Sequence, residues 1–389
     1  MKSKRIVVMG FMAGMPIGGV IWQHLHYIVG LQRLGHEVYY IEDSARTPYD
    51  PAGFTYALDD GYAVRTLEAL GRRFGFDGRW AFCPRYDDPT KSKGMAYDRV
   101  RALYREADAV LNVCGSQELH EEVLASDRLI YIESDPGVEQ MLVDKGEVGP
   151  RDHLGHYRAL FTFGENVPTP AFPVPLNGFE WFPTRQPIVT DFWQAAAPPK
   201  GAMFKSIANW NTSGSKDIVW RGETYLWSKS LEFLKFIEAP ARCCETFELA
   251  SDIKDRAIVE RFEANGWRVV DPHVRSRDVD DYRAYIQDSK AEFTAAKDQY
   301  VRLNTGWFSD RSACYLASGR PVITQDTGFG AHVQGEGGLF PFASMAEVEE
   351  AAARINADYD FHSRAAFDIA LEYFEATKVV ASILERAGV

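Results

Sequence analysis

The chain has 389 residues, which is long for a single hydrophobic core and predicts two domains. Its formal net charge of −12 argues against a protein that grips a nucleic acid, because phosphate contacts need clustered Lys and Arg, although it allows a small phosphorylated ligand. The five scattered cysteines predict neither a disulfide framework nor a zinc site. No apolar run approaches the roughly 20 residues of a membrane span, so we expect a soluble, cytoplasmic protein.

The chain begins with a strand, a glycine-rich turn and a helix. Residues 5–9 (RIVVM) are an apolar run, residues 10–19 (GFMAGMPIGG) predict the turn, and residues 20–34 predict the helix. Gly18 and Gly19 lack a Cβ beside a helix start, where a diphosphate can approach the backbone closely. We therefore interpret them as ligand contacts, and the alternative is a tight turn without a ligand.

Three further strands of the first half are followed by polar or small residues. Runs at residues 109–113, 129–133 and 159–163 predict buried parallel strands, whose carboxyl ends gather at one edge of the sheet. Asp135 and Glu165 follow the second and third of these runs, where a carboxylate can serve as a general base. For Asp135 an equally good interpretation is a turn-forming residue.

A third candidate base lies inside the first helix. His24 and His26 are about 200° apart around that helix, so at most one of them faces a cleft. We retain His24 as a candidate general base. The alternative is a packed or hydrogen-bonded histidine, which is the commoner role inside a helix.

A segment with several prolines and little periodicity separates the two halves and predicts a linker. The second half then opens with a strand at residues 203–208 and a polar turn at residues 209–215, in which Asn209 and Trp210 are candidate ligand contacts. The predicted division is a first Rossmann-like domain at 1–185, a linker at 186–202, a second Rossmann-like domain at 203–360 and terminal helices at 361–389.

Residues 305–330 (TGWFSDRSACYLASGRPVITQDTGFG) are the most informative part of the sequence. Ser309 and Asp310 are N-cap types, Gly319 is a left-handed helix terminator, and residues 321–324 predict a buried strand. The free N–H groups and the dipole of this helix start favour an anion. We therefore expect a site that binds a phosphate group and an aromatic or sugar ring. Its candidate residues lie before the helix, at its first turn and in the loop after the strand: Lys297, Trp307, Ser309, Asp310, Arg311, Ser312, Asp326, Thr327 and Gly328. The alternative is an ordinary capped helix, with Trp307 in the core and Arg311 on a solvated face.

Two segments resemble the signatures of GT-B glycosyltransferases. Residues 306–322 (GWFSDRSACYLASGRPV) resemble the nucleotide-sugar motif, and residues 5–43 resemble the first βαβ unit. The runs FTFGEN and EFTAAKDQYVR extend the similarity to a bacterial family usually described only as glycosyltransferases. The resemblance implies an α/β fold of two Rossmann-like domains that face each other across a cleft, with the last helices crossing back to the first domain. It also implies sugar transfer from a nucleoside diphosphate sugar, UDP among the candidates, to a small-molecule or glycan acceptor.

One position departs from the family pattern. Many retaining members carry a ribose-binding Glu where this chain has Cys314, whose thiol is a weak hydrogen-bonding group, so Asp310 or Asp326 is expected to hold the ribose. The acidic pairs do not follow strand ends as a metal-binding Asp-x-Asp does, so we expect neither a metal nor a cofactor. Lys297 and Arg311 would then stabilise the departing diphosphate. The alternatives are a nucleotide-sugar epimerase of the same fold, a glycosyltransferase acting on modified DNA bases and a catalytically silent sugar-nucleotide-binding protein.

Overall fold

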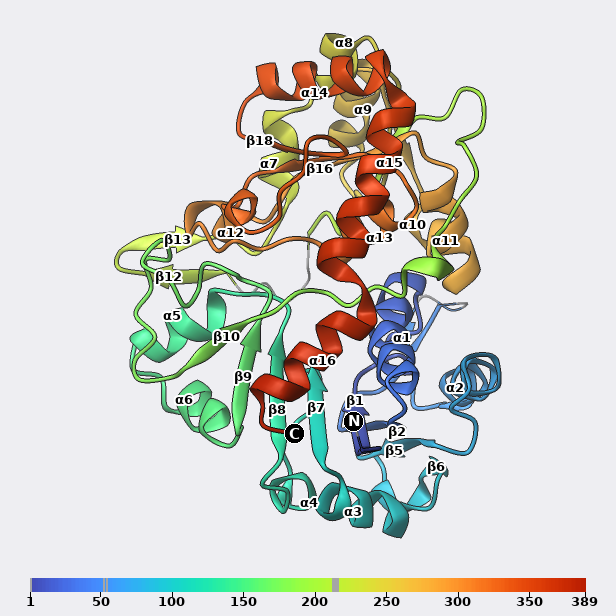
Figure 1. Cartoon of the computed structure of the whole chain (residues 1–389), viewed down its shortest axis with the longest axis vertical. Coiled ribbons are helices and arrows are strands. Elements are labelled where there is room, and N and C mark those ends of the chain that lie inside the picture. The colour runs from blue at the N-terminus through green and yellow to red at the C-terminus, as the bar shows by residue number, and fades with distance from the viewer. Residues whose placement is uncertain (1, 52, 54, 212–216) are drawn as a thin grey trace.

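The computed structural model of the protein describes residues 2–51, 53, 55–211 and 217–389, and it has two lobes (Figure 1). Of the polar turn predicted at residues 209–215, positions 212–215 lie outside the described residues. Each lobe is built around a mainly parallel β-sheet. The first lobe is at the bottom of Figure 1 and the second at the top.

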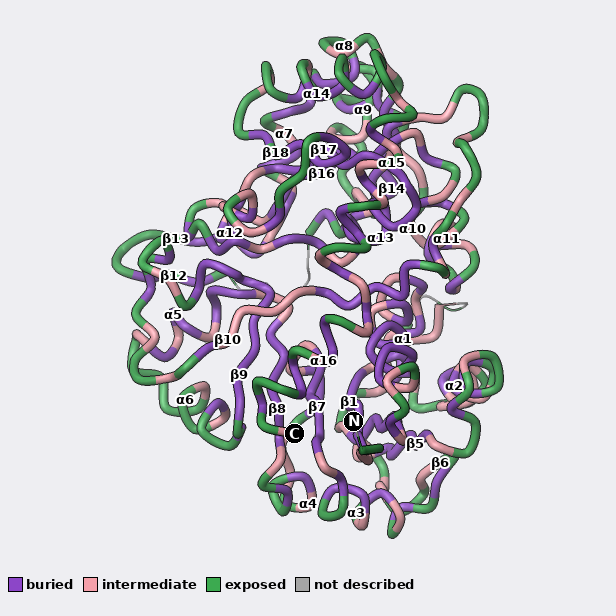
Figure 2. The backbone as a smooth tube through the Cα atoms, in the orientation of Figure 1, coloured by how far each residue is buried: buried purple, intermediate pink, exposed green. Residues whose placement is uncertain are grey.

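An eight-stranded sheet forms the centre of the first lobe, and all its neighbouring strands are parallel except β5 and β6. Strands β7 and β8 are buried along their whole length (Figure 2), as parallel strands rich in Val, Ile and Leu require when helices cover both faces. The strands, in spatial order, are β10 (Trp181–Pro183), β9 (Ala159–Thr162), β8 (Leu129–Glu133), β7 (Ala109–Val113), β1 (Arg5–Met9), β2 (Glu37–Ser44), β5 (Trp80–Pro84) and β6 (Lys93–Gly94). The helices are α1 (Gly18–Arg33), α2 (Gly61–Phe74), α3 (Tyr97–Glu106), α4 (Glu121–Leu124), α5 (Val138–Asp144) and α6 (Val148–Gly155).

A six-stranded, wholly parallel sheet forms the centre of the second lobe. Its strands, in spatial order, are β15 (Trp267–Val270), β14 (Phe247–Ala250), β11 (Phe204–Ile207), β16 (Ala291–Thr294), β17 (Val322–Gln325) and β18 (Leu339–Phe342). The helices are α7 (Ser230–Lys235), α8 (Ala239–Cys243), α9 (Arg256–Ala264), α10 (Pro272–Arg275), α11 (Val279–Gln287), α12 (Asp298–Arg302), α13 (Asp310–Ala317), α14 (Met345–Ala357) and α15 (Tyr359–Ile369). The last helix, α16 (Ala376–Arg386), belongs to the first lobe (Figure 1). None of the helices in the described ranges is long and apolar enough to cross a bilayer.

Two short hairpins were not predicted from the sequence. One pairs β3 (Tyr49–Asp50) with β4 (Thr55–Tyr56), and the other pairs β12 (Ile218–Trp220) with β13 (Glu223–Tyr225). The second hairpin follows the first strand of the second lobe but packs on α5 of the first lobe, where the Trp220 indole N–H donates to the Asp144 carboxylate at 2.9 Å. It therefore ties the two lobes together at one end of their interface.

The chain returns to the first lobe at its C-terminus. After α15 a π-helical turn at Ala370–Phe374 redirects the backbone, and α16 then lies against α1 (Figure 1). The contact is close because Gly30 of α1 has no side chain: an added Cβ would lie 3.0 Å from the Cβ of Ala376. A parallel bridge between Ile188 and Glu375 joins this crossing to the segment that connects the two sheets.

The carboxyl ends of the two sheets face each other. The strand order changes direction between β1 and β7 in the first sheet and between β11 and β16 in the second. In open α/β sheets, ligands bind at such switch points. Contacts across this interface include a backbone bridge between Gly164, which follows β9, and Trp307, which precedes α13.

Candidate functional site

A cavity of about 390 Å³ lies between the two lobes. Its first-lobe side comes from α1 and from the loops after β1, β2, β7, β8 and β9, and its second-lobe side comes from the start of α13 and the residues before it. The lining residues are Phe11, Gln23, Arg46, Cys114, Gly115, Ser116, Ser134, Asp135, Phe163, Trp307 and Asp310. The structure thus brings together three residues that the sequence singled out, Asp135, Trp307 and Asp310.

Trp307 connects the two sides of this cavity. Its indole N–H donates to the carbonyl oxygen of Ser134 at 2.9 Å, and its ring centroid lies 4.6 Å from that of Tyr300. The side chain is half-buried. Because a hydrogen bond and a ring contact both fix it, Trp307 presents a rigid aromatic surface at the cavity wall.

Lys229, the residue before α7, is the cation that the sequence analysis missed. It is only 9% exposed, and its ammonium makes no hydrogen bond or ion pair with any residue that the structure describes. Its ammonium lies 5.3 Å from the centre of the Trp307 ring. Burial, together with the nearby Arg311 and Lys297 cations, lowers the pKa of Lys229 well below its usual range. A lysine at a helix N-terminus opposes the helix dipole, and this is the sequence signal that could have identified it.

Asp135 is held by two residues of the second lobe. Its carboxylate accepts a hydrogen bond from Lys297 at 2.6 Å and another from the Tyr300 hydroxyl. The Lys297 ammonium also lies 3.2 Å from the centre of the Trp227 ring. Asp135 therefore lines the cavity and also forms an ion pair between the lobes. These contacts go beyond those of a residue that only forms a turn, which was the alternative interpretation from the sequence.

Asp310 begins α13 and faces the cavity. Burial raises the pKa of its carboxyl, against the opposing effect of Arg311. Cys314, one turn further along, is buried, and the two residues also line a small enclosed space between the lobes. Ser309 and Ser312 are buried as well, and the Ser312 hydroxyl has no hydrogen-bond partner among the described residues. Asp310 thus lines the interlobe cavity, whereas Cys314, the position of the ribose-binding Glu in the family pattern, does not.

The structure corrects the interpretation of Arg311 as a phosphate ligand. Its guanidinium is buried within the second lobe, where Nε donates to Glu292 at 2.5 Å, Nη1 to the Ile207 carbonyl at 2.6 Å and Nη2 to the Thr294 hydroxyl at 2.7 Å. Glu292 has no exposed side-chain surface. The sequence could not show this pair, because Glu292 lies on a different element, β16.

We expect Arg311→Ala to destabilise the fold by about 3–5 kcal/mol, because it leaves the Glu292 carboxylate buried without its cation. Urea unfolding of the variant measures this loss. The double variant Arg311→Met/Glu292→Gln removes both charges and should recover most of the stability. A fully stable Arg311→Ala protein that had lost affinity for nucleoside diphosphates would restore the phosphate-binding interpretation.

His24 does not face the cavity. Its ring is fully buried against Gly10 and Tyr40, and its Nδ1 lies 2.8 Å from the Val20 carbonyl oxygen of the preceding helical turn. Burial lowers the pKa of His24 to about 4. The candidate base is therefore a neutral core histidine, the packed alternative considered from the sequence.

Glu165 is also engaged elsewhere. Its carboxylate accepts two hydrogen bonds from Arg185, at 2.7 and 2.8 Å, and the same guanidinium donates to the His332 carbonyl in the second lobe. A carboxylate bound by a two-pronged guanidinium is a poor base. The structure therefore assigns Glu165 to the junction between the lobes.

The loop after β17 belongs to the same junction. Thr327 donates its hydroxyl proton to the Trp307 carbonyl at 2.5 Å, and the Asp326 carboxylate accepts from the backbone of Gly328 at 2.8 Å. A Cβ on Gly328 would collide with the side chains of Asn304 and Asn166. Asp326, Thr327 and Gly328 thus shape the backbone that carries Trp307, and none of them lines the interlobe cavity.

Gly18 and Gly19 approach protein instead of open space. A Cβ on Gly18 would overlap the Asp278 carbonyl and the Tyr282 side chain at the start of α11, and a Cβ on Gly19 would lie 3.3 Å from the Tyr282 ring. The Gly18 N–H donates to the Ser276 carbonyl at 2.8 Å. This contact also explains why α1 begins at Gly18 and not at Val20: the glycine pair is the surface on which the second lobe rests.

The turn after β11 divides into a core residue and a surface residue. Trp210 is buried, and its ring lies edge-on to that of Phe262 with 5.5 Å between the centroids. It therefore belongs to the hydrophobic core of the second lobe and is not a surface on which a ligand ring stacks. Asn209 is exposed. Within the described ranges, no three His, Cys, Asp or Glu side chains are grouped so that they could share a metal ion.

No protein-family model and no curated protein sequence matches the chain. Solved structures match it over its whole length. An α-glucosyltransferase in complex with UDP and DNA containing an HMU base has a TM-score of 0.59 at 10% identity, with 100% of both chains covered. HepE of Anabaena, in complex with UDP-glucose, has a TM-score of 0.53 at 11% identity, with 99% of both chains covered. AviGT4, a glycosyltransferase involved in avilamycin A biosynthesis, has a TM-score of 0.52 at 12% identity, with 99% of this chain and 97% of that one covered.

These matches establish the class of fold. The chain consists of two Rossmann-like domains that face each other across a cleft, the GT-B arrangement that residues 5–43 and 306–322 predicted. The proteins it resembles in fold are glycosyltransferases described with UDP or UDP-glucose. At identities of 10–12% the likeness is one of fold, and the activity has to be argued from the site.

Proposed function

We propose that the protein is a glycosyltransferase that moves a sugar from a UDP-sugar to an acceptor hydroxyl in the interlobe cavity. The observation that carries this proposal is Lys229, which is 9% exposed, lies 5.3 Å from the centre of the Trp307 ring and forms no ion pair with any described residue, although the Glu292 and Asp310 carboxylates are near enough to act on its pKa. A buried charge without a counter-ion is costly, so such a residue implies that a bound ligand supplies the anion. We further propose that the chain belongs with the bacterial family that shares the motif at residues 306–322.

The surroundings of Lys229 suit a nucleoside diphosphate. Lys297 lies near enough to depress the pKa of Lys229, and the start of α13 adds free backbone N–H groups and the positive end of a helix dipole. Trp307 supplies a flat apolar surface beside these donors. The donor would therefore lie on the second lobe at the β11–β16 switch point, with Asp310 placed to accept from a sugar or ribose hydroxyl.

The chemical step needs charge stabilisation and a base. The acceptor oxygen bonds to the anomeric carbon while the bond from that carbon to the β-phosphate oxygen breaks, and UDP leaves with the negative charge. Lys229 and Lys297 stabilise that charge, which is the work a divalent cation does in other transferases, so we propose a metal-independent reaction. The proton of the acceptor hydroxyl passes to Asp135, which the diphosphate frees by drawing Lys297 away from it.

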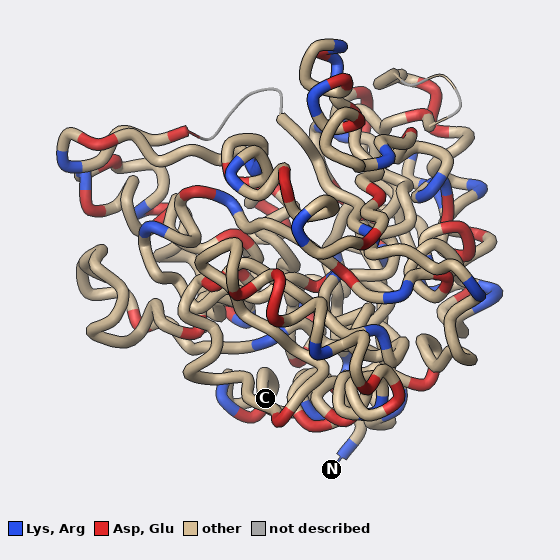
Figure 3. The backbone as a smooth tube through the Cα atoms, turned by 90° about the horizontal axis from the view of Figure 1, so that it is seen from above, with Lys and Arg blue, Asp and Glu red and all other residues tan. Residues whose placement is uncertain are grey.

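A nucleic-acid acceptor fits this chain less well. The α-glucosyltransferase of similar fold holds DNA, but here the net charge is −12 and acidic and basic residues are interspersed along the backbone (Figure 3). Phosphate backbones need a continuous basic surface. An epimerase would use the same donor contacts without an acceptor, and the experiment below separates it from a transferase.

Thermal-shift and calorimetric titration with UDP, GDP and dTDP, alone and as glucose conjugates, tests the proposal. We expect UDP and UDP-sugars to raise the melting temperature, because a ligand that binds only the folded state stabilises it. Slow release of UDP from the matching UDP-sugar should occur even with water as acceptor. Epimerisation without UDP release would favour the epimerase, and no affinity for any nucleoside diphosphate would overturn both.

A further inference from the structure

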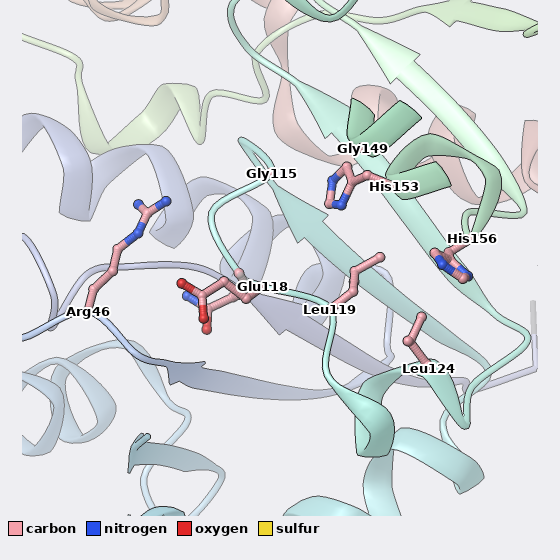
Figure 4. Close-up of a pocket in the computed structure, with 9 residues that line it drawn as sticks. Arg46, Gly115, Glu118, Leu119, Leu124, Gly149, His153 and His156 are labelled. Carbon is pink, nitrogen blue, oxygen red and sulfur yellow. The ribbon is translucent and has the colours of Figure 1, made fainter. Parts of the chain in front are cut away.

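A second cavity, of about 380 Å³, opens from the interlobe cavity into the first lobe (Figure 4). Arg46 and Gly115 line both cavities, so the two spaces meet at these residues. The second cavity lies among the loop after β2, the loop after β7, α4 and α6. We call it the side groove.

The walls of the side groove differ in character. Leu119 and Leu124 form one wall, and Leu124 is 38% exposed, which leaves apolar surface open to a ligand. Gly149 and His153, both from α6, form the opposite wall together with His156. A Cβ on Gly149 would meet no atom within 4 Å, so the space above this glycine is open.

The groove carries one charge of each sign where it meets the interlobe cavity. Arg46 and Glu118 project there (Figure 4), and within the part of the chain that the structure describes neither forms an ion pair. Burial and the neighbouring His156 lower the pKa of His153. The lining therefore combines a guanidinium, a carboxylate and imidazoles, and the formal charges of its one Arg and one Glu offset each other.

We propose that the side groove binds the sugar units of a neutral glycan, whose terminal hydroxyl reaches Asp135 in the interlobe cavity. This inference rests on the proposed glycosyltransferase activity and names its acceptor class. Guanidinium, carboxylate and imidazole groups can each donate to or accept from the hydroxyls of a sugar ring, and the C–H face of the ring can pack on Leu119 and Leu124. The open side over Gly149 leaves room for a chain of more than one sugar.

Two other acceptor classes fit this lining less well. A phosphorylated or carboxylated acceptor would be attracted by Arg46 but would also lie beside Glu118, so attraction and repulsion would largely offset each other. A wholly apolar acceptor would strip water from Arg46, Glu118 and His153 without replacing their hydrogen bonds. A neutral polyhydroxyl compound satisfies both the polar and the apolar parts of the groove.

The test uses the full chain, a UDP-sugar that it hydrolyses, and three kinds of acceptor: neutral trisaccharides of glucose, galactose or mannose, the same trisaccharides with a terminal phosphate, and a straight-chain alkyl alcohol. We expect transfer to a neutral trisaccharide. Gly149→Phe should fill the groove and raise KM for that acceptor by about 10-fold or more. Gly155→Phe is the matched control, because Gly155 lies on the same helix with nothing within 4 Å of an added Cβ but does not line the groove.

The outcomes separate the acceptor proposal from the proposed function. Transfer only to the phosphorylated trisaccharide or to the alkyl alcohol, or equal KM values for the two glycine variants, would overturn the glycan groove and leave the transferase intact. Calorimetry of UDP with each variant checks that the donor site is unaffected. If UDP failed to bind the wild type while a trisaccharide bound it and did not bind Gly149→Phe, the transferase proposal would fail and the groove assignment would stand.

Discussion

Lys229→Met should make the ligand-free protein more stable and at the same time remove its response to UDP. The substitution replaces a nearly buried lysine, which forms no ion pair within the described ranges, with an apolar side chain of similar length, and we expect a gain of about 1–3 kcal/mol in the free energy of unfolding. The same change removes a charge-assisted contact to the diphosphate, so the Kd for UDP should rise by about 100-fold. These opposite signs distinguish a ligand-binding cation from a structural one.

Thermal unfolding with and without UDP measures both effects. Lys205→Met is the matched control, because Lys205 is a half-buried lysine of the same lobe with a lowered pKa, and its ammonium lies 4.9 Å from the Tyr285 ring. Lys205 lies over the Tyr285 ring, whereas Lys229 lies over the Trp307 ring at the cavity wall, so the Lys205 variant should keep the full response to UDP. A Lys229→Met protein that was destabilised and still bound UDP normally would contradict the proposed function.

Asp135→Asn should lower the rate of sugar transfer by about 100-fold or more, because the amide cannot take the acceptor proton. Affinity for UDP should be retained or should rise, since the amide no longer competes with the diphosphate for Lys297. The variant should also melt earlier, because Asp135 is paired with Lys297 and Tyr300 across the interface.

Tyr300→Phe provides the comparison that separates the base from the interlobe contact. It removes one hydrogen bond to Asp135 and leaves the carboxylate in place. We expect Tyr300→Phe to lower the melting temperature while keeping most of the transfer activity, measured as UDP release in the presence of acceptor. Equal losses of activity in the two variants would reduce Asp135 to an interface residue, and Asp310, the other carboxylate of the cavity, would be the next base to test.

The sequence by itself determined several of the central strands and helices and their order along the chain. Residues 5–9, 109–113 and 129–133 form strands with the predicted bounds, because continuous apolar runs of five residues between turns fit only buried parallel strands here. The helix at Asp310–Ala317 and its left-handed terminator at Gly319 were also predictable, since N-cap chemistry and a positive φ are local properties. The two matching signatures then indicated the GT-B fold.

Only the tertiary structure decided which polar groups remain available to a ligand. Arg311 and Glu165 have the residue types and the positions of site residues, but Glu292 and Arg185, on other elements, neutralise them. Lys229 drew no attention in the sequence, and the fold buries it without an ion-pair partner among the residues that the structure describes. A buried charge is stable only with a partner, and whether that partner is protein or ligand depends on which distant elements pack beside it. That is a property of the packed lobes, so no local pattern in the chain could have revealed it.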